Sequence, residues 1–348
     1  MIKRLFLKIK YRARYFINPK VWSLLSSGII KFREFQYLEK FKSYGNLHPD
    51  KTFYIIRRRP PAWGLFSNIF YVVQGILYAE EKGFIPVVDM ENYWVGELSE
   101  VKKINETRNA WCYLFQQISD YNLSEVYKSK NVVLSNGYKI FGHEHWLELK
   151  NRDLIMNPRL LKLTKEILSK YINLNHMTIA ALESAKKRIE WDGGKTLGIF
   201  VRGGNYYLNA GTKLTDIPKY EYLLSNIYTM ALTAQVSRIF ICTEDFRFYN
   251  KLSRDLKEFN IVQSIRYPEN LTLEEWQKDQ KLTFDNSILM GYEKSLKYLI
   301  EILLLSECKY TISTNSNASI FALIMNDINC GEHKLLFNDQ VLNLGEIP

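Results

Sequence analysis

Short runs of apolar and β-branched residues alternate along this chain with longer segments whose apolar positions recur at helical spacing. The short runs predict strands over residues 53–57, 86–90, 131–135, 196–202, 238–244, 261–266, 310–315 and 334–338. The longer segments predict helices over residues 68–82, 159–171, 177–190, 220–235, 246–259, 294–308 and 319–326. Because strand and helix take turns, the pattern indicates an α/β protein whose parallel sheets are covered by helices on both faces.

A seam falls at Trp191-Asp192-Gly193-Gly194, where two charged helices end and a new strand begins. We therefore expect an arm over residues 1–42, a first α/β domain over residues 43–190 and a second over residues 191–348. Open α/β sheets bind ligands outside the carboxyl ends of their strands. The site is accordingly expected in the cleft between the two domains.

Composition narrows the class of protein. The chain has 348 residues, of which 47% are hydrophobic, and this excludes a disordered or collagen-like chain. The four cysteines are far apart, so neither a zinc knuckle nor a disulfide framework is predicted and a reducing compartment fits best. His143 and His145 flank Glu144, which is not a known ligand spacing on a helix, and we expect no metal and no other cofactor.

The net charge of +10 is concentrated at the amino-terminal end. Residues 1–42 carry 11 basic and 2 acidic side chains, a net charge of +9, whereas the remaining residues carry 36 and 35, a net charge of +1. A nearly neutral body argues against the broad phosphate-binding face that a nucleic acid requires, so no nucleic-acid partner is expected.

The basic residues of this arm are interleaved with apolar ones, among them Leu5, Phe6, Tyr15 and Trp22. This pattern predicts an amphipathic helical arm that lies on an anionic membrane surface, with a plain surface helix or a solvated terminus as the alternative. No apolar stretch approaches the roughly 20 residues of a spanning helix, and the charges run through the apolar part, unlike those of a signal peptide. The expected location is the cytoplasm, at the inner face of the membrane.

An arginine and two glycines follow the predicted strand over residues 196–202. Arg202 stands at its carboxyl end, and Gly203 and Gly204 would let backbone N–H groups approach a ligand closely. A pyrophosphate suits this place, because guanidinium forms paired hydrogen bonds with phosphate oxygens. The alternative is an ordinary Gly-Gly turn with the arginine in a surface ion pair.

Two more strand ends lead into helices. Thr314, Ser316 and Asn317 stand where a strand opens into an apolar helix, whose first N–H groups make an anion site; helix capping alone is the alternative. Gly64 and Asn68 stand at a similar turn in the first half, which permits another close backbone approach. Neither turn is a G-x-G-x-x-G fingerprint, so a nicotinamide or flavin is poorly supported.

Taken in order, these segments resemble the fucosyltransferase superfamily, especially bacterial members of the α1,2 and α1,6 type, over about residues 50–330. Gly64-Leu65-Phe66-Ser67-Asn68 is similar to the opening glycine loop of the family, and residues 200–206 are similar to its signature H-x-R-R-x-D-Y. Residues 240–245 resemble the next strand with its T-[DE]-D ending. Residues 299–302 and 313–319 resemble the third motif.

This resemblance implies two Rossmann-like domains that face each other across a cleft, the GT-B arrangement, with the nucleotide sugar held by the second domain. It implies transfer from GDP-fucose with inversion at the anomeric carbon and without a required metal. Arg202 matches the arginine that neutralises the donor pyrophosphate, and Glu301 matches an acidic residue near the base. The expected donor-binding residues are Gly64, Asn68, Gly203, Gly204, Asn205, Glu244, Glu301, Thr314, Ser316 and Asn317. For the base that takes the acceptor proton, the candidate is Asp216.

The expected function is thus the transfer of fucose from GDP-fucose to a glycan or lipid-linked oligosaccharide in cell-surface polysaccharide synthesis. Two alternatives stay open: the same fold with another nucleotide sugar, and a non-catalytic module that binds a glycan or a nucleotide. They are motivated by Phe200, Gly203 and Asn205, which stand where the family usually has histidine, arginine and aspartate.

Overall fold

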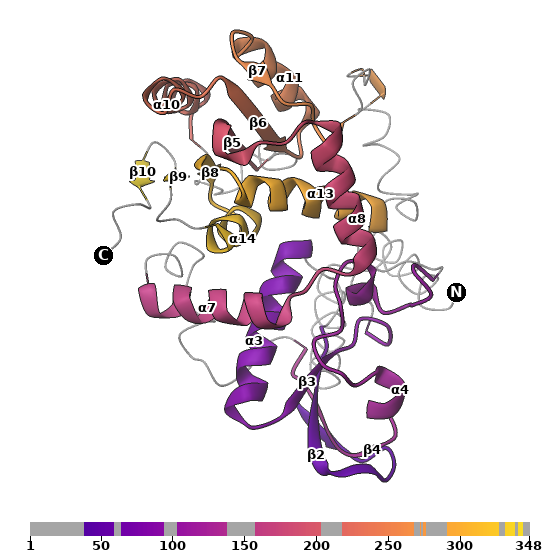
Figure 1. Ribbon diagram of the computed structural model, residues 1–348. Coiled ribbons are helices and arrows are strands. Elements are labelled where there is room, and N and C mark those ends of the chain that lie inside the picture. Colours follow the sequence, from indigo (N-terminus) through magenta and orange to yellow (C-terminus); the bar gives the residue numbers. More distant parts are fainter. Residues whose placement is uncertain are drawn as a thin grey trace, which may run out of the picture.

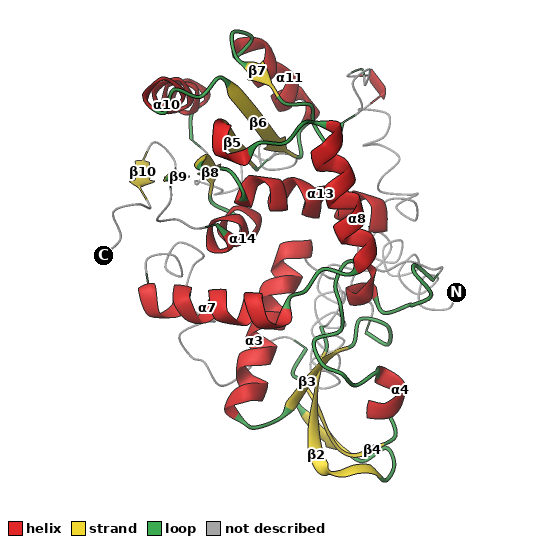
Figure 2. Ribbon diagram, viewed as in Figure 1, coloured by secondary structure: helices red, strands yellow, loops and turns green. Residues whose placement is uncertain are grey.

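The computed structural model describes residues 38–58, 64–93, 103–137, 157–202, 218–267, 272, 274–275, 291–326, 331–337 and 340–343. It is a mixed α/β fold with two sheets of mostly parallel strands, as the alternation in the sequence predicts (Figures 1 and 2). Residues 1–37 of the expected arm lie outside the described residues. Its end does not, because Lys40–Lys42 forms an edge strand of the first sheet.

The first sheet contains β1 (Lys40–Lys42), β2 (Leu47–Ile56), β3 (Ile85–Val88) and β4 (Ser129–Leu134) in the order β1-β4-β2-β3. β2 pairs in parallel with β3 and β4, and β1 runs antiparallel to β4. Helix α3 (Leu65–Glu81) makes the crossover from β2 to β3, as a parallel pair requires. The neighbours of β2 thus lie on its two sides, and the switch point of this sheet falls between β2 and β4.

The second sheet has the strand order β10-β9-β8-β5-β6-β7. Every neighbouring pair is parallel except β9 and β10. Read from β7, this is the order of doubly wound nucleotide-binding sheets, with the switch point between β5 and β8. The strands are β5 (Thr196–Val201), β6 (Arg238–Thr243), β7 (Asn260–Ile261), β8 (Tyr310–Thr314), β9 (Glu332–Phe337) and β10 (Gln340–Asn343).

Helices connect these strands, and several of the helices lie between the two sheets (Figure 1). The second half contains α10 (Tyr220–Thr233), α11 (Phe246–Asp255), α13 (Gly291–Ser306) and α14 (Asn317–Met325). The first half adds η1 (Ala110–Tyr113), α4 (Leu123–Val126), α7 (Pro158–Tyr171) and α8 (His176–Arg188), and η2 (Gly193–Lys195) leads into β5. None of the helices in the described part is long and apolar enough to cross a membrane.

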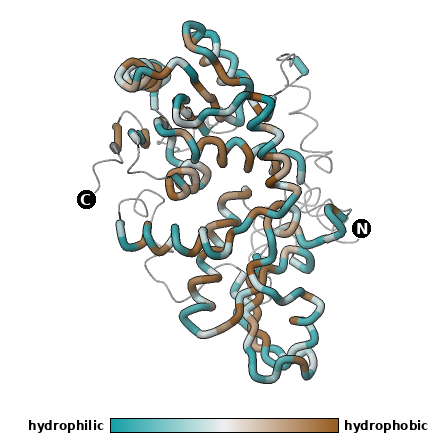
Figure 3. Tube along the Cα trace, viewed as in Figure 1, coloured by the Kyte–Doolittle hydropathy of each residue, from teal (hydrophilic) through white to brown (hydrophobic). Residues whose placement is uncertain are grey.

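One continuous cluster of buried side chains joins the two halves. Phe66 of α3 contacts Tyr298 of α13 and Phe321 of α14, each at 5.1 Å between ring centroids. Apolar segments accordingly line the helices between the sheets in Figure 3. Gly198 in β5 lets α13 approach, since an added Cβ would lie 2.6 Å from Leu305 and 2.9 Å from the Sγ of Cys308.

The prediction from the sequence differs from the structure at short edge strands. β1 and β10 are not predicted, because three or four residues carry too little pattern. The strand predicted over 261–266 ends at Ile261, since the following residues turn to bond with another element. Ser264 and the backbone N–H of Arg266 both donate hydrogen bonds to Glu301 of α13.

Candidate functional site

The switch point of the second sheet brings Arg202 next to Thr314. Arg202 follows β5 and is half-buried, and Thr314 is the buried last residue of β8. The backbone N–H of Arg202 donates to Thr314 Oγ1 at 2.9 Å, so the chain is fixed where the two strands end. Two residues predicted from separate motifs are thereby joined at one edge of the sheet.

The start of α14 lies directly beyond Thr314. Ser316 caps this helix and forms a capping box with Ser319: each hydroxyl accepts from the other residue's backbone N–H, at 3.1 Å and 3.0 Å. Ser319 Oγ also donates to the carbonyl of Thr314 at 2.7 Å. Asn317 is the first helical residue, and the first N–H groups of a helix have no acceptor within it. The positive end of the helix dipole is therefore held beside Arg202.

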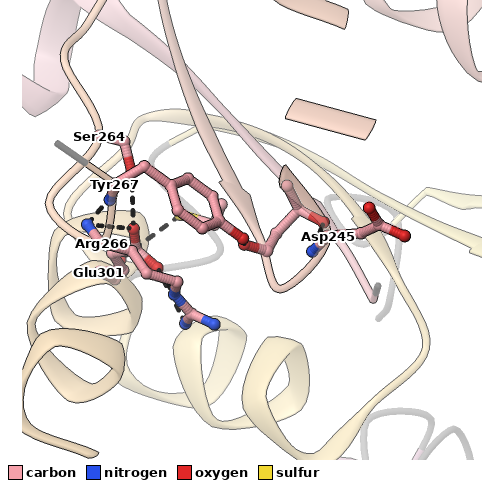
Figure 4. Close-up of polar contacts among 7 residues, drawn as sticks. Asp245, Ser264, Arg266, Tyr267 and Glu301 are labelled. Atoms are coloured by element: carbon pink, nitrogen blue, oxygen red, sulfur yellow. Dashed lines mark hydrogen bonds and ion pairs between the residues drawn. The ribbon is translucent and has the colours of Figure 1, made fainter. Parts of the chain in front are cut away.

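A buried ion pair stands behind this edge (Figure 4). Glu301 of α13 is 1% exposed, and its carboxylate accepts a hydrogen bond from Arg266 Nε at 3.1 Å and forms an ion pair with Arg266 Nη2 at 3.0 Å. Its other oxygen accepts from the backbone N–H of Arg266 at 3.2 Å and from Ser264 Oγ at 3.3 Å. The segment that carries Ser264 and Arg266 is also fixed to the end of β6, because the hydroxyl of Tyr267 donates to the carbonyl of Thr243 at 2.9 Å.

The side chain of Tyr298 lies close to the charged groups of this edge. The guanidinium of Arg266 lies 4.6 Å from the centre of its ring. Burial raises the pKa of Tyr298 well above its ordinary value, Glu244 raises it further, and Arg266 and Arg202 oppose the shift. Arg202 and Glu244 therefore lie close enough to Tyr298 to act on its charge. Since the same ring contacts Phe66, Tyr298 links this edge to the start of α3.

Burial and the partner charge act in opposite directions on the pKa of each member of the Arg266–Glu301 pair. Burial raises the pKa of Glu301, and Arg266 opposes that shift. Burial would lower the pKa of Arg266, but Glu301 and Glu244 outweigh it and the pKa is raised. Arg266 is accordingly a permanent cation at this edge, held by a carboxylate that has nearly all its hydrogen-bonding capacity in use.

The facing edge of the first half is built around Arg58, which follows β2. Its Nη1 donates to the carbonyl of Ser67 at 2.9 Å and to Asn68 Oδ1 at 2.7 Å, and its guanidinium lies 4.8 Å from the ring centre of Tyr71. Burial lowers the pKa of Arg58 to about 10, which still leaves a cation at neutral pH. Among the residues that the structure describes, its partners are all neutral.

Gly64 caps α3 without a side-chain hydrogen bond, and an added Cβ there would meet no atom within 4 Å. No atom of the described residues therefore fills the space next to Gly64. Asn68, by contrast, is 1% exposed and is fixed by Arg58. Within the described ranges, no group of three or more His, Cys, Asp or Glu side chains gathers that could hold a metal ion.

Comparisons with known proteins find similarity in structure only. The sequence matches no family model and no curated protein. The chain is similar to the fucosyltransferase NodZ from Bradyrhizobium, at 14% identity and a TM-score of 0.46 over 84% of this chain and 98% of that one. It is also similar to POFUT1 in complex with GDP-fucose (10% identity, TM-score 0.43, 80% and 95% covered) and to a variant of Arabidopsis thaliana FUT1 in complex with GDP (11%, 0.44, 83% and 71%). Similarity to solved fucosyltransferases is what the sequence motifs predict.

The structure brings most of the described candidates to one region. Arg202, Thr314, Ser316 and Asn317 share the switch point, and Glu244 and Glu301 lie around Tyr298 and Arg266. Gly64 and Asn68 stand at the start of α3, across the Phe66–Tyr298 contact. Four candidates lie outside the described residues: Gly203, Gly204, Asn205 and Asp216.

Sequence reasoning missed three side chains of this region, namely Arg58, Arg266 and Tyr298. Arg266 is the last residue of a predicted strand and Arg58 directly follows another, so both stand near the position that drew attention to Arg202. That shared position was a usable signal. Tyr298 had none, because only the packing of α13 against α3 gives this residue its place.

Proposed function

We propose that this chain is a glycosyltransferase that moves fucose from GDP-fucose onto a glycan acceptor in the synthesis of cell-surface polysaccharide. In this proposal residues 191–348 form a Rossmann-like domain for the nucleotide sugar and residues 43–190 form the acceptor-side domain, in the GT-B arrangement. The observation that carries it is the hydrogen bond from Arg202 to Thr314 at the β5–β8 switch point. It fixes the backbone of Arg202 next to a capped helix start, where sheets of this strand order bind nucleotides.

The chemistry follows from the charge that develops during transfer. An acceptor hydroxyl oxygen forms a bond to C1 of the sugar on the face opposite the leaving group, which inverts the anomeric carbon. The bond from C1 to the phosphate oxygen breaks, and its electron pair leaves with the nucleoside diphosphate. Arg202 and the N–H groups at the start of α14 stabilise that negative charge, so the proposal requires no metal.

The acceptor hydroxyl must also lose its proton, and a carboxylate in the cleft is the group that we propose for this step. Asp216 remains the proposed base. In the first half, Arg58 holds the start of α3 through Ser67 and Asn68, and Asn68 remains a proposed donor-binding residue. The Phe66–Tyr298 contact supports this assignment, because it connects that start to the edge that carries Arg202.

Another nucleotide sugar is the second candidate, and the Arg266–Glu301 pair favours it. The carboxylate expected near the base is buried and engaged with Arg266 and Ser264. A guanine that is read by Glu301 would have to compete with these bonds. A donor whose base is read by other groups avoids that competition.

A nucleotide screen separates the candidates. A ligand that binds only the folded chain raises its melting temperature, so we would compare GDP, UDP, CDP and dTDP at equal concentrations. We expect GDP alone among the four to raise the melting temperature. We also expect the chain to release GDP from GDP-fucose only when a glycan acceptor is present, and to do so in EDTA as well. Selective stabilisation by another nucleotide would favour the second candidate. Stabilisation by none would contradict both and leave a non-catalytic glycan-binding module.

A further inference from the structure

Exposed apolar side chains are concentrated at one edge of the first sheet. Eight large hydrophobic residues are exposed in the described part of the chain, and four of them fall between residues 38 and 47. Phe41 is the most exposed of all, at 74%. We call these four residues, Leu38, Phe41, Tyr44 and Leu47, the edge strip.

The edge strip runs from the outer side of β4 around the start of that strand to Leu47, the first residue of β2. Phe41 lies in β1, the edge strand, where it is opposite Val133 near the end of β4. At the other end of the strip, the backbone N–H groups of Tyr44 and Leu47 donate to the carbonyls of Ser129 and Lys128, each at 3.0 Å. The part of the strip at β1 therefore borders the end of the sheet.

Lysine residues lie next to the edge strip along its length. Lys40 and Lys42 flank Phe41, and Lys128 and Lys130 border the start of β4, with the last three exposed. The chain that leads into the strip, residues 1–37, contributes nine more basic side chains and one acidic, Glu34, together with many apolar ones. Exposed aromatic and aliphatic groups set among lysines match a surface that offers both negative charge and an apolar layer.

We propose that the edge strip is a docking surface for an anionic lipid bilayer. Phe41 and its apolar neighbours enter the headgroup layer, and the surrounding lysines meet lipid phosphates. A nucleic acid would use the lysines but would leave the aliphatic side chains in water. Pairing of β1 with a second copy of the chain is disfavoured by the lysines, since lysine on an edge strand hinders such pairing.

Docking here would place the carboxyl edge of the first sheet near the lipid. Arg57, which follows β2, donates from Nη2 to the carbonyl of Leu38 at 2.9 Å, so the strip begins at the edge where Arg58 and α3 lie. If the first half binds the acceptor, that acceptor is lipid-linked. This consequence rests on the proposed function, whereas the docking itself does not.

The test is vesicle binding by the full chain, without any measurement of transfer. Vesicles of phosphatidylcholine alone are compared with vesicles of phosphatidylcholine and phosphatidylglycerol in equal parts. We expect binding to the anionic vesicles only, weakened by added salt. Phe41→Ser should weaken it about tenfold, as should Lys40→Gln combined with Lys42→Gln. Leu232→Ser is the matched control, because Leu232 lies on α10 and is 70% exposed, and it should bind like the unmodified chain.

Several results would overturn the proposal: equal binding to neutral and anionic vesicles, equal effects of Phe41→Ser and Leu232→Ser, or displacement of the chain from vesicles by duplex DNA. A change of oligomeric mass in Phe41→Ser, with vesicle binding intact, would assign the strip to a second copy instead. Melting temperatures of the variants check that they are folded. Failure of the nucleotide screen would leave these outcomes unaffected.

Discussion

The two sheets carry the same device at their switch points. In the first sheet Arg57 follows β2 and donates its backbone N–H to Ser135 Oγ, next to β4, at 3.0 Å. In the second sheet Arg202 follows β5 and donates its backbone N–H to Thr314 Oγ1, at the end of β8, at 2.9 Å. An arginine and a hydroxyl thus join the central strand to its later neighbour in both halves.

The side chains of these two arginines differ in what they do. Arg57 is 4% exposed and binds the carbonyls of Ser135 and Leu38 and the hydroxyl of Tyr93, so it ties its own half together. Arg202 is half-buried and lies within electrostatic reach of Tyr298, at the contact between the halves. The same backbone device thus supports a structural arginine in one sheet and a candidate ligand-binding arginine in the other.

The largest expected effect concerns the ion pair behind the second switch point. Glu301→Ala removes the only carboxylate that the described residues offer to Arg266 as an ion-pair partner and leaves that guanidinium buried. We expect the free energy of unfolding to fall by about 3–5 kcal/mol, measured by chemical denaturation. Glu80→Ala, which breaks the more exposed pair with Lys170, is the control and should change it by less than about 1 kcal/mol. Equal losses would contradict the idea that the second half depends on a buried pair.

The next effect tests the shared device itself. Thr314→Val and Ser135→Ala each remove the hydroxyl that accepts from an arginine N–H, and each should lower the free energy of unfolding by about 1–3 kcal/mol. Only Thr314→Val should also weaken GDP binding, because only Arg202 is assigned to the ligand. Calorimetric titration of GDP into both variants checks this. A weaker affinity in both would show that the comparison is mistaken.

A smaller loss is expected at the helix caps. Ser316→Ala removes the cap of α14 and should lower the free energy of unfolding by about 1 kcal/mol. The side chain of Asn157 caps α7 by accepting from the backbone N–H of Leu160. Asn157→Ala removes this cap and should have a similar effect on stability. GDP should bind more weakly to the first variant and normally to the second. If the reverse holds, the start of α14 has no part in the site.

The smallest effect is a pH dependence at Glu80. Partial burial would raise its pKa, but hydrogen bonds from Lys170 and Tyr171 outweigh burial and hold the pKa below the ordinary value of 4.5. A carboxyl with a lowered pKa in the folded chain stabilises it above the unfolded pKa and loses that contribution as the pH falls. Because both side chains are partly solvated, the contribution is about 0.5 kcal/mol. The difference in unfolding free energy between the unmodified chain and Glu80→Gln should therefore shrink between about pH 6 and about pH 3; a constant difference would contradict this.

Local sequence predicts much of this fold and less of the site. The buried run that becomes β5 has a strong pattern of its own, and all six of its residues are buried as predicted. Arg202 and Ser316 stand at the strand end and helix start that the sequence indicates. The Arg266–Glu301 pair could not be predicted, because it joins residues 35 positions apart. Glu301 consequently looks like a ligand-binding carboxylate in the sequence and has an internal partner in the structure.

The most direct measurement is the affinity for GDP of Arg202→Ala against that of Arg254→Ala. Arg254 lies on α11 with its side chain 74% exposed, so its removal controls for the loss of one positive charge in the same half. We expect Arg202→Ala to bind GDP about 10- to 100-fold more weakly, while its free energy of unfolding stays close to that of the unmodified chain. Arg254→Ala should bind GDP normally. GDP affinity in Arg202→Ala equal to that of the unmodified chain would contradict the assignment of the second switch point to the donor diphosphate.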